Sequence, residues 1–138
     1  GGCTGMRVEW NHVVNDVSAG DNFEDIVNVY QSRGHPNDYL KIRHNYLRGG
    51  GPSPNGGGIL GCDGGSCSHV NISSNVLVEP GQYGVAFACG KNSIATDNVI
   101  FQSAQRWTNI GMYVADYYQD GCAGLTVQNN RMNYRRYS

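Results

Sequence analysis

Short runs of alternating apolar and polar residues recur along the chain, and each run leads into an asparagine at the same place. These anchor asparagines are Asn11, Asn45, Asn75, Asn98 and Asn130. The positions five before, three before and two after each anchor are almost all apolar, and they read Met6, Val8 and Val13; Leu40, Ile42 and Leu47; Val70, Ile72 and Leu77; Ser93, Ala95 and Ile100; and Leu125, Val127 and Met132. A period of two within each run predicts strands with one inward face.

The anchor asparagines interrupt this alternation at a fixed point. A residue that tolerates left-handed backbone is expected at such a corner between two strands, and asparagine is one. Successive anchors lie 34, 30, 23 and 32 residues apart, which corresponds to one repeating unit with loops of different length. The recurrence of this unit predicts a solenoid in which each repeat forms one coil.

Further apolar runs lie between the anchors, at residues 26–29, 58–60, 85–88 and 110–114. Each coil then has two or three strands, and stacked coils bury an apolar face that one coil cannot bury alone. We therefore predict an all-β fold, a right-handed parallel β-helix of about four to five coils. An antiparallel sandwich also has short strands, but it does not require asparagines in phase. Residues 1–138 form one domain, which is either complete, a fragment or a repeat unit of a longer assembly.

Two of the runs carry a resemblance to a known family. Residues 70–77 (VNISSNVL) and 125–132 (LTVQNNRM) resemble coils of the pectate-lyase-like superfamily of right-handed parallel β-helix proteins. Residues 21–30 and 49–58 are similar to segments of secreted β-helix repeat proteins whose function is unassigned. The resemblance implies a β-helix and an extracellular location, but many functions share this scaffold, so no activity follows from it.

Composition and charge exclude some partners. The formal net charge of −1 argues against nucleic acid, which binds to basic surfaces. The sequence contains no run of 18 apolar residues, so we expect no membrane span. Charged residues make up only 15% of the chain, and 20 glycines are typical of a fold with many tight turns.

Five cysteines are many for a domain of this size, and their spacing does not match zinc-binding pairs. We expect disulfides and an oxidising compartment. The sequence leaves two pairings open: Cys62–Cys67 together with Cys89–Cys122, or Cys67–Cys89. Cys3 is the odd cysteine in either case, and it is the candidate for a thiol that bonds to another chain.

The two ends of the chain have similar sequences. Residues 2–11 align with residues 121–130, and a Gly, Cys, Gly, Val and Asn coincide in order. Neither end carries a recognisable cap, and uncapped solenoids expose strand edges on which another copy can stack. A contact of this kind propagates into a fibre. Our leading hypothesis is an extracellular structural module that stacks end to end with itself; the alternative is a fragment whose caps lie elsewhere.

A second hypothesis is a polysaccharide-active enzyme: a lyase, an epimerase or a glycoside hydrolase. Such enzymes need a base with a cation, or a pair of carboxylates. The catalytic candidates lie in or near the loop before residue 36 and are Asp21, Glu24, Asp25, Arg33 and His35. Asp63 and Asp116 follow strands of later coils and can line the same face. The signature motifs of polygalacturonases and alginate epimerases are missing, which favours solvated loop charges as the simpler interpretation.

A third hypothesis is a carbohydrate-binding module, in which aromatic rings align without a catalytic base. Aromatic rings stack on sugars, and the candidates for this role are Tyr83, Trp107, Tyr113 and Tyr117. Tyrosines in successive coils of a solenoid also pack on one another for purely structural reasons. We expect neither a metal nor a cofactor.

Overall fold

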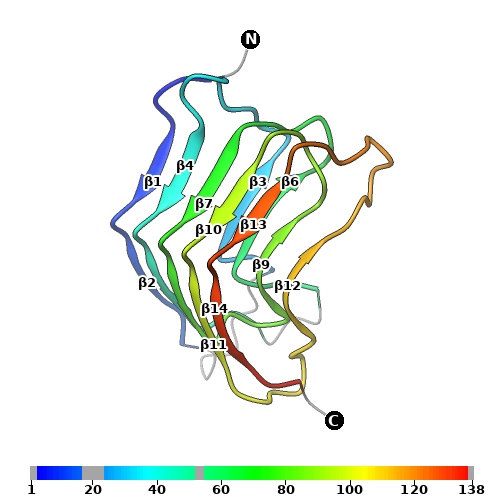
Figure 1. Ribbon diagram of the computed structural model, residues 1–138. Helices are drawn as coiled ribbons and strands as arrows, with labels where there is room; N and C mark the ends of the chain where they lie inside the picture. The colour runs from blue at the N-terminus through cyan, green and yellow to red at the C-terminus, as the bar shows by residue number, and fades with distance from the viewer. Residues whose placement is uncertain (1–2, 17–23, 52–54, 137–138) are drawn as a thin grey trace.

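The structure is a computed structural model that describes residues 3–16, 24–51 and 55–136. These residues form strands and no helix, and every pairing between the named strands is parallel. The chain passes through three sheets in turn and winds into a β-solenoid of about four turns (Figure 1). The predicted fold class, an all-β parallel solenoid, is confirmed, and the antiparallel sandwich is wrong.

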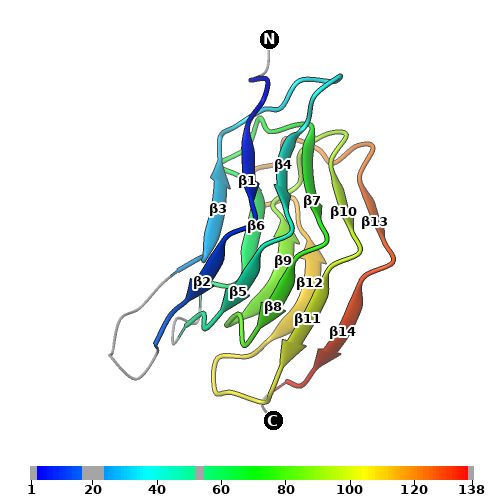
Figure 2. The ribbon, with the colours of Figure 1, turned by 90° about the vertical axis from the view of Figure 1, so that its left-hand side faces the viewer.

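Each sheet collects one strand from every coil. Sheet 1 contains, in spatial order, β1 (Arg7–Glu9), β4 (Leu40–Arg43), β7 (Val70–Ser73), β10 (Ile94–Thr96) and β13 (Thr126–Gln128). Sheet 2 contains β2 (His12–Val14), β5 (Tyr46–Arg48), β8 (Val76–Val78), β11 (Val99–Gln102) and β14 (Arg131–Tyr134). Sheet 3 contains β3 (Val27–Tyr30), β6 (Ile59–Asp63), β9 (Tyr83–Phe87) and β12 (Ile110–Val114). Figure 2 shows the strands of sheets 1 and 2 side by side along the solenoid.

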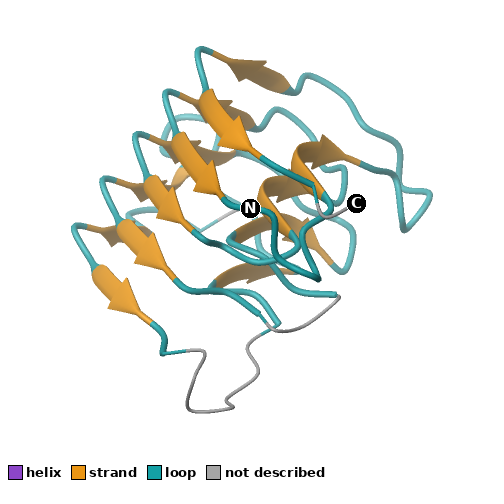
Figure 3. Ribbon diagram, turned by 90° about the horizontal axis from the view of Figure 1, so that it is seen from below, coloured by secondary structure: helices purple, strands orange, loops and turns teal. Residues whose placement is uncertain are grey.

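The core lies between the sheets and consists of columns of inward side chains, one residue per coil. In sheet 1 the column runs through Val8, Ile42, Ile72, Ala95 and Val127. The three middle members are 0% exposed, whereas Val8 is 38% and Val127 is 47% exposed. Seen from below the molecule, the coils lie over one another (Figure 3), so each coil covers the apolar face of the next. The first and last coils are covered on one side only by the described residues.

The corner between sheets 1 and 2 differs from the prediction in one detail. The residue before each anchor asparagine has the left-handed backbone, with φ between 55° and 59°, and these residues are Trp10, His44, Ser74, Asp97 and Asn129. The asparagine itself does not, so the prediction that it takes this conformation is wrong. The left-handed residue turns the chain, and the asparagine that follows directs its side chain into the molecule. There the side-chain amide provides hydrogen bonds in place of the backbone bonds between strands that are interrupted at the bend.

Both disulfides of one predicted pairing are present. Cys62–Cys67 closes the loop between β6 and β7, with a Cα–Cα distance of 4.9 Å. Cys89–Cys122 has a Cα–Cα distance of 4.8 Å and joins the loops after β9 and before β13, on adjacent coils. Cys3 is exposed and has a free thiol. Of the two pairings that the sequence left open, the structure therefore contains the first.

Candidate functional sites

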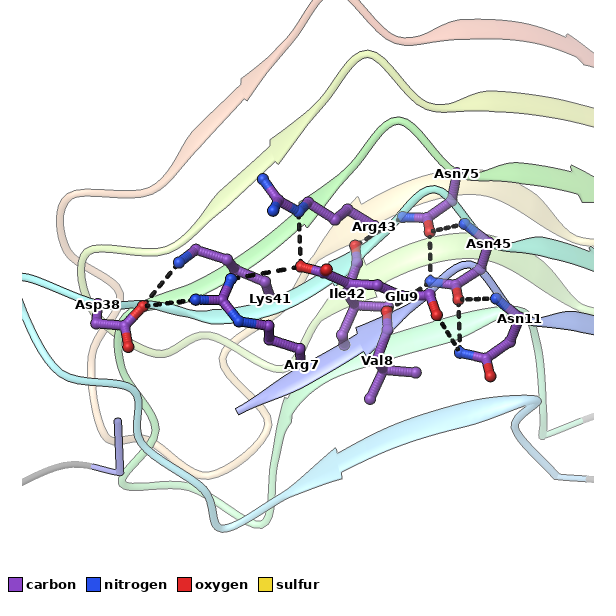
Figure 4. A network of polar contacts seen from close by, with 10 residues as sticks. All are labelled: Arg7, Val8, Glu9, Asn11, Asp38, Lys41, Ile42, Arg43, Asn45 and Asn75. Carbon is purple, nitrogen blue, oxygen red and sulfur yellow. Dashed lines mark hydrogen bonds and ion pairs between the residues drawn. The ribbon is translucent and has the colours of Figure 1, made fainter. Parts of the chain in front are cut away.

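The anchor asparagines form a ladder of hydrogen bonds along the whole solenoid. In each step the backbone N–H and the side-chain Nδ2 of one asparagine both donate to Oδ1 of the asparagine in the next coil. These donor–acceptor distances lie between 2.9 and 3.1 Å. Figure 4 shows the first two steps, from Asn11 through Asn45 to Asn75. Asn75 and Asn98 are 0% exposed, so the middle of the ladder is shielded from water.

The same side chains also donate backwards, which gives the ladder a direction. Nδ2 of Asn45 donates to the carbonyl oxygen of Val8, at 2.8 Å, and Nδ2 of Asn75 donates to that of Ile42, at 2.9 Å. Asn98 and Asn130 repeat this bond to the preceding coil, each at 3.0 Å. Each acceptor is the residue three positions before the previous anchor. Every coil–coil contact therefore repeats one directional set of hydrogen bonds.

The two ends of the ladder carry opposite unused groups. At the first coil, Nδ2 of Asn11 turns to the carbonyl oxygen of Glu9, at 3.2 Å, and Oδ1 points away from the ladder (Figure 4). Among the described residues no donor reaches this oxygen. At the last coil, Nδ2 of Asn130 turns to the carbonyl oxygen of Gln128, at 3.0 Å, and no described residue accepts the Asn130 backbone N–H. One end thus offers an acceptor and the other a donor.

Charged side chains connect the outer faces of the first two coils. Arg43 Nε donates to Glu9 Oε1 at 2.7 Å, and Arg7 Nη1 lies 3.6 Å from the same oxygen (Figure 4). Arg7 Nη2 also lies 3.9 Å from Oδ1 of Asp38 in the second coil, and Lys41 Nζ of that coil lies 2.7 Å from the same oxygen. The hydrogen bond from Arg43 lowers the pKa of Glu9, and the hydrogen bond from Lys41 lowers the pKa of Asp38. Both carboxylates therefore favour the folded state when they are ionised.

A second cluster of polar side chains lies on sheet 3, where two carboxylates share one amide. Asn28 Nδ2 donates to Asp25 Oδ2 at 2.8 Å and to Asp63 Oδ2 at 3.0 Å. Asp25 also accepts from the Gly57 backbone N–H, at 3.1 Å, and from the Tyr83 hydroxyl. Asp63 comes from the end of β6, so the strand pairing of β3 with β6 brings the two carboxylates together.

Tyrosines surround this carboxylate pair. Tyr118 donates its hydroxyl to Asp63 Oδ1 at 2.5 Å, and this bond raises the pKa of Tyr118. The rings of Tyr83 and Tyr113 meet edge to face at 5.1 Å, and those of Tyr113 and Tyr117 at 6.2 Å. Burial raises the pKa values of Tyr83 and Tyr113, and the hydrogen bond to Asp25 adds to the shift of Tyr83. The Tyr83 hydroxyl therefore keeps its proton and acts as a hydrogen-bond donor to Asp25.

The predicted catalytic residues do not all meet at this cluster. Asp21 lies outside the described residues, and Glu24 is exposed next to Asp25. Asp25 precedes β3, whereas Arg33 and His35 follow it, so these two lie beyond the other end of that strand. The pairing of Asp25 with Asp63 matches the expectation that later coils contribute to the face. Sequence reasoning missed Asn28, whose outward position in the run 26–29 was the available signal.

The predicted sugar-stacking residues differ in how much of their rings is accessible. Tyr83 is 1% exposed, so its ring offers no face to a sugar; the ring packs edge to face against Tyr113, and its hydroxyl binds Asp25. Tyr113 is half-buried and Tyr117 is 64% exposed. Trp107 is half-buried, and its Nε1 is shielded from water without a hydrogen-bond partner among the described residues. Tyr117 therefore has the most accessible ring of these four.

Two further places show polar groups but no defined ligand chemistry. A cavity of about 290 Å³ beside Arg33 also contains Lys91 and Asp120, so its charges have both signs. Arg33 donates to the Ser66 carbonyl oxygen and Asp120 accepts from the Ser66 N–H, so both are already engaged. Asp116 lies with the two sulfurs of the Cys89–Cys122 disulfide, which are not thiolates and do not favour a metal there.

No protein-family model, curated protein or solved structure matches this chain. The class of protein is therefore defined by its own geometry, a parallel β-solenoid with two disulfides. Within the described ranges, no helix has the length and apolar character needed to cross a membrane.

Proposed function

We propose that the chain is an extracellular structural module whose coils stack end to end with those of other copies, as a filament subunit. One observation carries the proposal: the first and last coils present the two complementary halves of the contact that holds the molecule's own coils together. The Asn11 end offers an unused acceptor and the Asn130 end an unused donor. The two disulfides support an oxidising, extracellular environment.

Exposed apolar side chains at the two ends support the same role. Val127 and Met132 of the last coil are 47% and 52% exposed, although their column neighbours Ala95 and Ile100 are 0% and 1% exposed. Fully burying one such side chain is worth about 1.5–3 kcal/mol, so a contact that covers several of them is favourable. Strand edges with unpaired backbone groups add hydrogen bonds to this contact.

Sedimentation velocity over a range of concentrations, with electron microscopy of the same samples, tests the proposal. We expect the unmodified chain to form particles that lengthen with concentration. Val127→Lys places a charge in the contact and keeps the protein monomeric. Val76→Lys is the matched control, because Val76 is 38% exposed but lies in β8, the middle strand of sheet 2. A chain that stays monomeric at every concentration, with native circular dichroism, refutes stacking.

Cys3 is the proposed intermolecular thiol, because it is exposed and unbonded. Two Cys3 thiols from different copies lose two protons, and two electrons pass to an oxidant such as molecular oxygen, when they join. Non-reducing electrophoresis of air-oxidised protein is expected to show a dimer that Cys3→Ser abolishes. Monomers throughout would remove Cys3 from this role.

A second candidate function is binding or cleavage of an extracellular polysaccharide. The observation that favours it is the carboxylate pair Asp25 and Asp63, bridged by Asn28. Tyr83 and Tyr113 connect this pair to the exposed ring of Tyr117. A screen of neutral and acidic glycans, with binding and product release as readouts, tests it. Asp63→Asn should abolish any signal and the exposed Asp97→Asn should preserve it. A signal that survives Asp63→Asn contradicts this site.

A further inference from the structure

The direction of the asparagine ladder fixes how two copies can meet. We propose that copies stack head to tail, so that Asn130 of one copy forms hydrogen bonds to Asn11 of the next copy. The strands on the two sides of this junction pair in the same register as neighbouring coils within the molecule. This inference rests on the proposed function and adds its polarity and register. All four internal steps have the same pattern of donors and acceptors, so the fifth step, across the junction, needs no new kind of contact.

Four hydrogen bonds define the junction. The Asn130 backbone N–H donates to Oδ1 of Asn11 in the next copy, as the Asn98 N–H donates to Asn130 within the chain, at 3.0 Å. Nδ2 of Asn130 leaves the Gln128 carbonyl and donates to the same Asn11 oxygen, as Nδ2 of Asn98 donates to Asn130 at 2.9 Å. Nδ2 of that Asn11 leaves the Glu9 carbonyl and donates to the Val127 carbonyl, as Asn130 donates to Ala95. The His12 N–H of the next copy donates to the Asn130 carbonyl, as Arg131 donates to Asn98 at 2.8 Å.

The side chains at the junction fit this register. Continuing the sheet 1 pairing places Val127 on Val8, and both are exposed apolar residues of the inward column. The same register places Thr126 beside Arg7 and Gln128 beside Glu9, so no like charges meet in sheet 1. A slip by one residue would turn the apolar side chains of the incoming strand to the outer face.

Other polarities leave the ladder unsatisfied. A contact between two first coils brings two Asn11 oxygens together, and these are both acceptors. A contact between two last coils brings together two Asn130 N–H groups, which are both donors. Only the head-to-tail contact repeats the complete set of donors and acceptors that each internal step of the ladder uses. Within such a stack, Cys3 of one copy does not meet Cys3 of another copy. A disulfide between two Cys3 residues therefore joins copies that belong to different stacks.

Directed cross-linking tests the register. Thr126→Cys and Arg7→Cys are each made on a Cys3→Ser background, purified separately and mixed before oxidation with copper phenanthroline. Neighbouring strands lie about 4.8 Å apart, which suits a disulfide between directly paired positions. The oxidant takes two electrons as each cross-link forms. We expect covalent dimers in the mixture and not in either variant alone.

The controls separate a wrong register from a wrong function. Thr126→Cys mixed with Glu9→Cys cross-links efficiently only if the register is shifted by two residues. Arg7→Cys alone cross-links only in a head-to-head contact. Either result, in samples that sediment as assemblies, overturns the junction and leaves end-to-end stacking intact. Samples that sediment only as monomers, with neither pair cross-linked, overturn the stacking proposal as well.

A variant of Asn11 gives an independent measure. Asn11→Leu removes the Oδ1 acceptor and the Nδ2 donor from the junction, and we expect at least a tenfold weaker association. Asn71→Leu is the matched control, because Asn71 lies on the outer face of β7, in the middle of the solenoid. Equal association constants for the two variants would remove the ladder from the junction.

Discussion

Asn75 in the middle of the ladder is the strongest test of what the asparagines do for the fold. Its side chain takes part in four hydrogen bonds: it accepts from the backbone N–H and Nδ2 of Asn45 and donates to Asn98 Oδ1 and the Ile42 carbonyl. The residue is 0% exposed, so water cannot replace these partners. Asn75→Ala therefore leaves buried donors without acceptors.

The magnitude follows from the groups that lose their partners. Two buried N–H groups of Asn45 lose their acceptor, and each unsatisfied buried group costs about 1–3 kcal/mol. We therefore expect Asn75→Ala to lower the free energy of unfolding by about 3–4 kcal/mol. Asn11→Ala removes bonds at an exposed end, where water can replace them, and should cost less than about 1 kcal/mol.

Urea unfolding followed by circular dichroism measures these differences. The variants are made on the Val127→Lys background, so that association does not add to the apparent stability. Asn71→Ala is the control, because Asn71 Oδ1 has no hydrogen-bond partner among the described residues; its cost should stay within about 0.5 kcal/mol. A loss for Asn75→Ala no larger than that for Asn71→Ala would refute the reasoning.

Three further predictions concern pH and the disulfides. Burial raises the pKa of Tyr134 to about 12, above the ordinary phenol value of about 10, so its contribution to stability is present below pH 10 and is lost as the pH rises. Tyrosinate absorbance should therefore increase together with unfolding; ionisation of all tyrosines near pH 10 in the folded state would contradict this. The lowered pKa of Glu9 stabilises the fold above about pH 4, and this stabilisation is lost as the pH falls. Glu9→Gln should therefore weaken the fall in the free energy of unfolding at acid pH, measured by denaturation. An unchanged fall would count against the Arg43 contact. Replacing Cys89 and Cys122, which are 33 residues apart, by Ala should lower the free energy of unfolding by about 3–4 kcal/mol in thermal unfolding experiments. Removing the Cys62–Cys67 disulfide, which joins residues only 5 apart, should cost less. The reverse order would show that strain or residual structure dominates.

The coil architecture could be predicted from the sequence because its physical cause is periodic. Inward positions such as Ile42, Ile72 and Ala95 recur with the same offset from an asparagine, and stacking is the arrangement that buries all of them. The position of the left-handed residue was not predictable in this way. Residues as different as Trp10 and Ser74 take it, so no residue type marks the corner.

The candidate polysaccharide site was predicted only in part, because its members come from different coils. Asp25 and Asp63 meet through the pairing of β3 with β6, and that register includes an irregularity after Asn28. A sequence pattern does not reveal such a shift. The burial of Tyr83 was equally hidden, since Tyr113 and Asp25, which contact this side chain, come from other coils.

The ladder also connects the stability of one copy with the association of several. In a single copy Asn11 has one coil beside it, and its oxygen is unused. In the proposed stack Asn11 gains a second neighbouring coil and the same set of partners as Asn75. The loss in free energy of unfolding on replacing Asn11 should then rise from the small value expected at an exposed coil towards the value expected for the buried Asn75. The reason is that the groups that lose their hydrogen bonds can no longer bind water. A ladder that stabilised only the single chain would give Asn11 the same cost in both states.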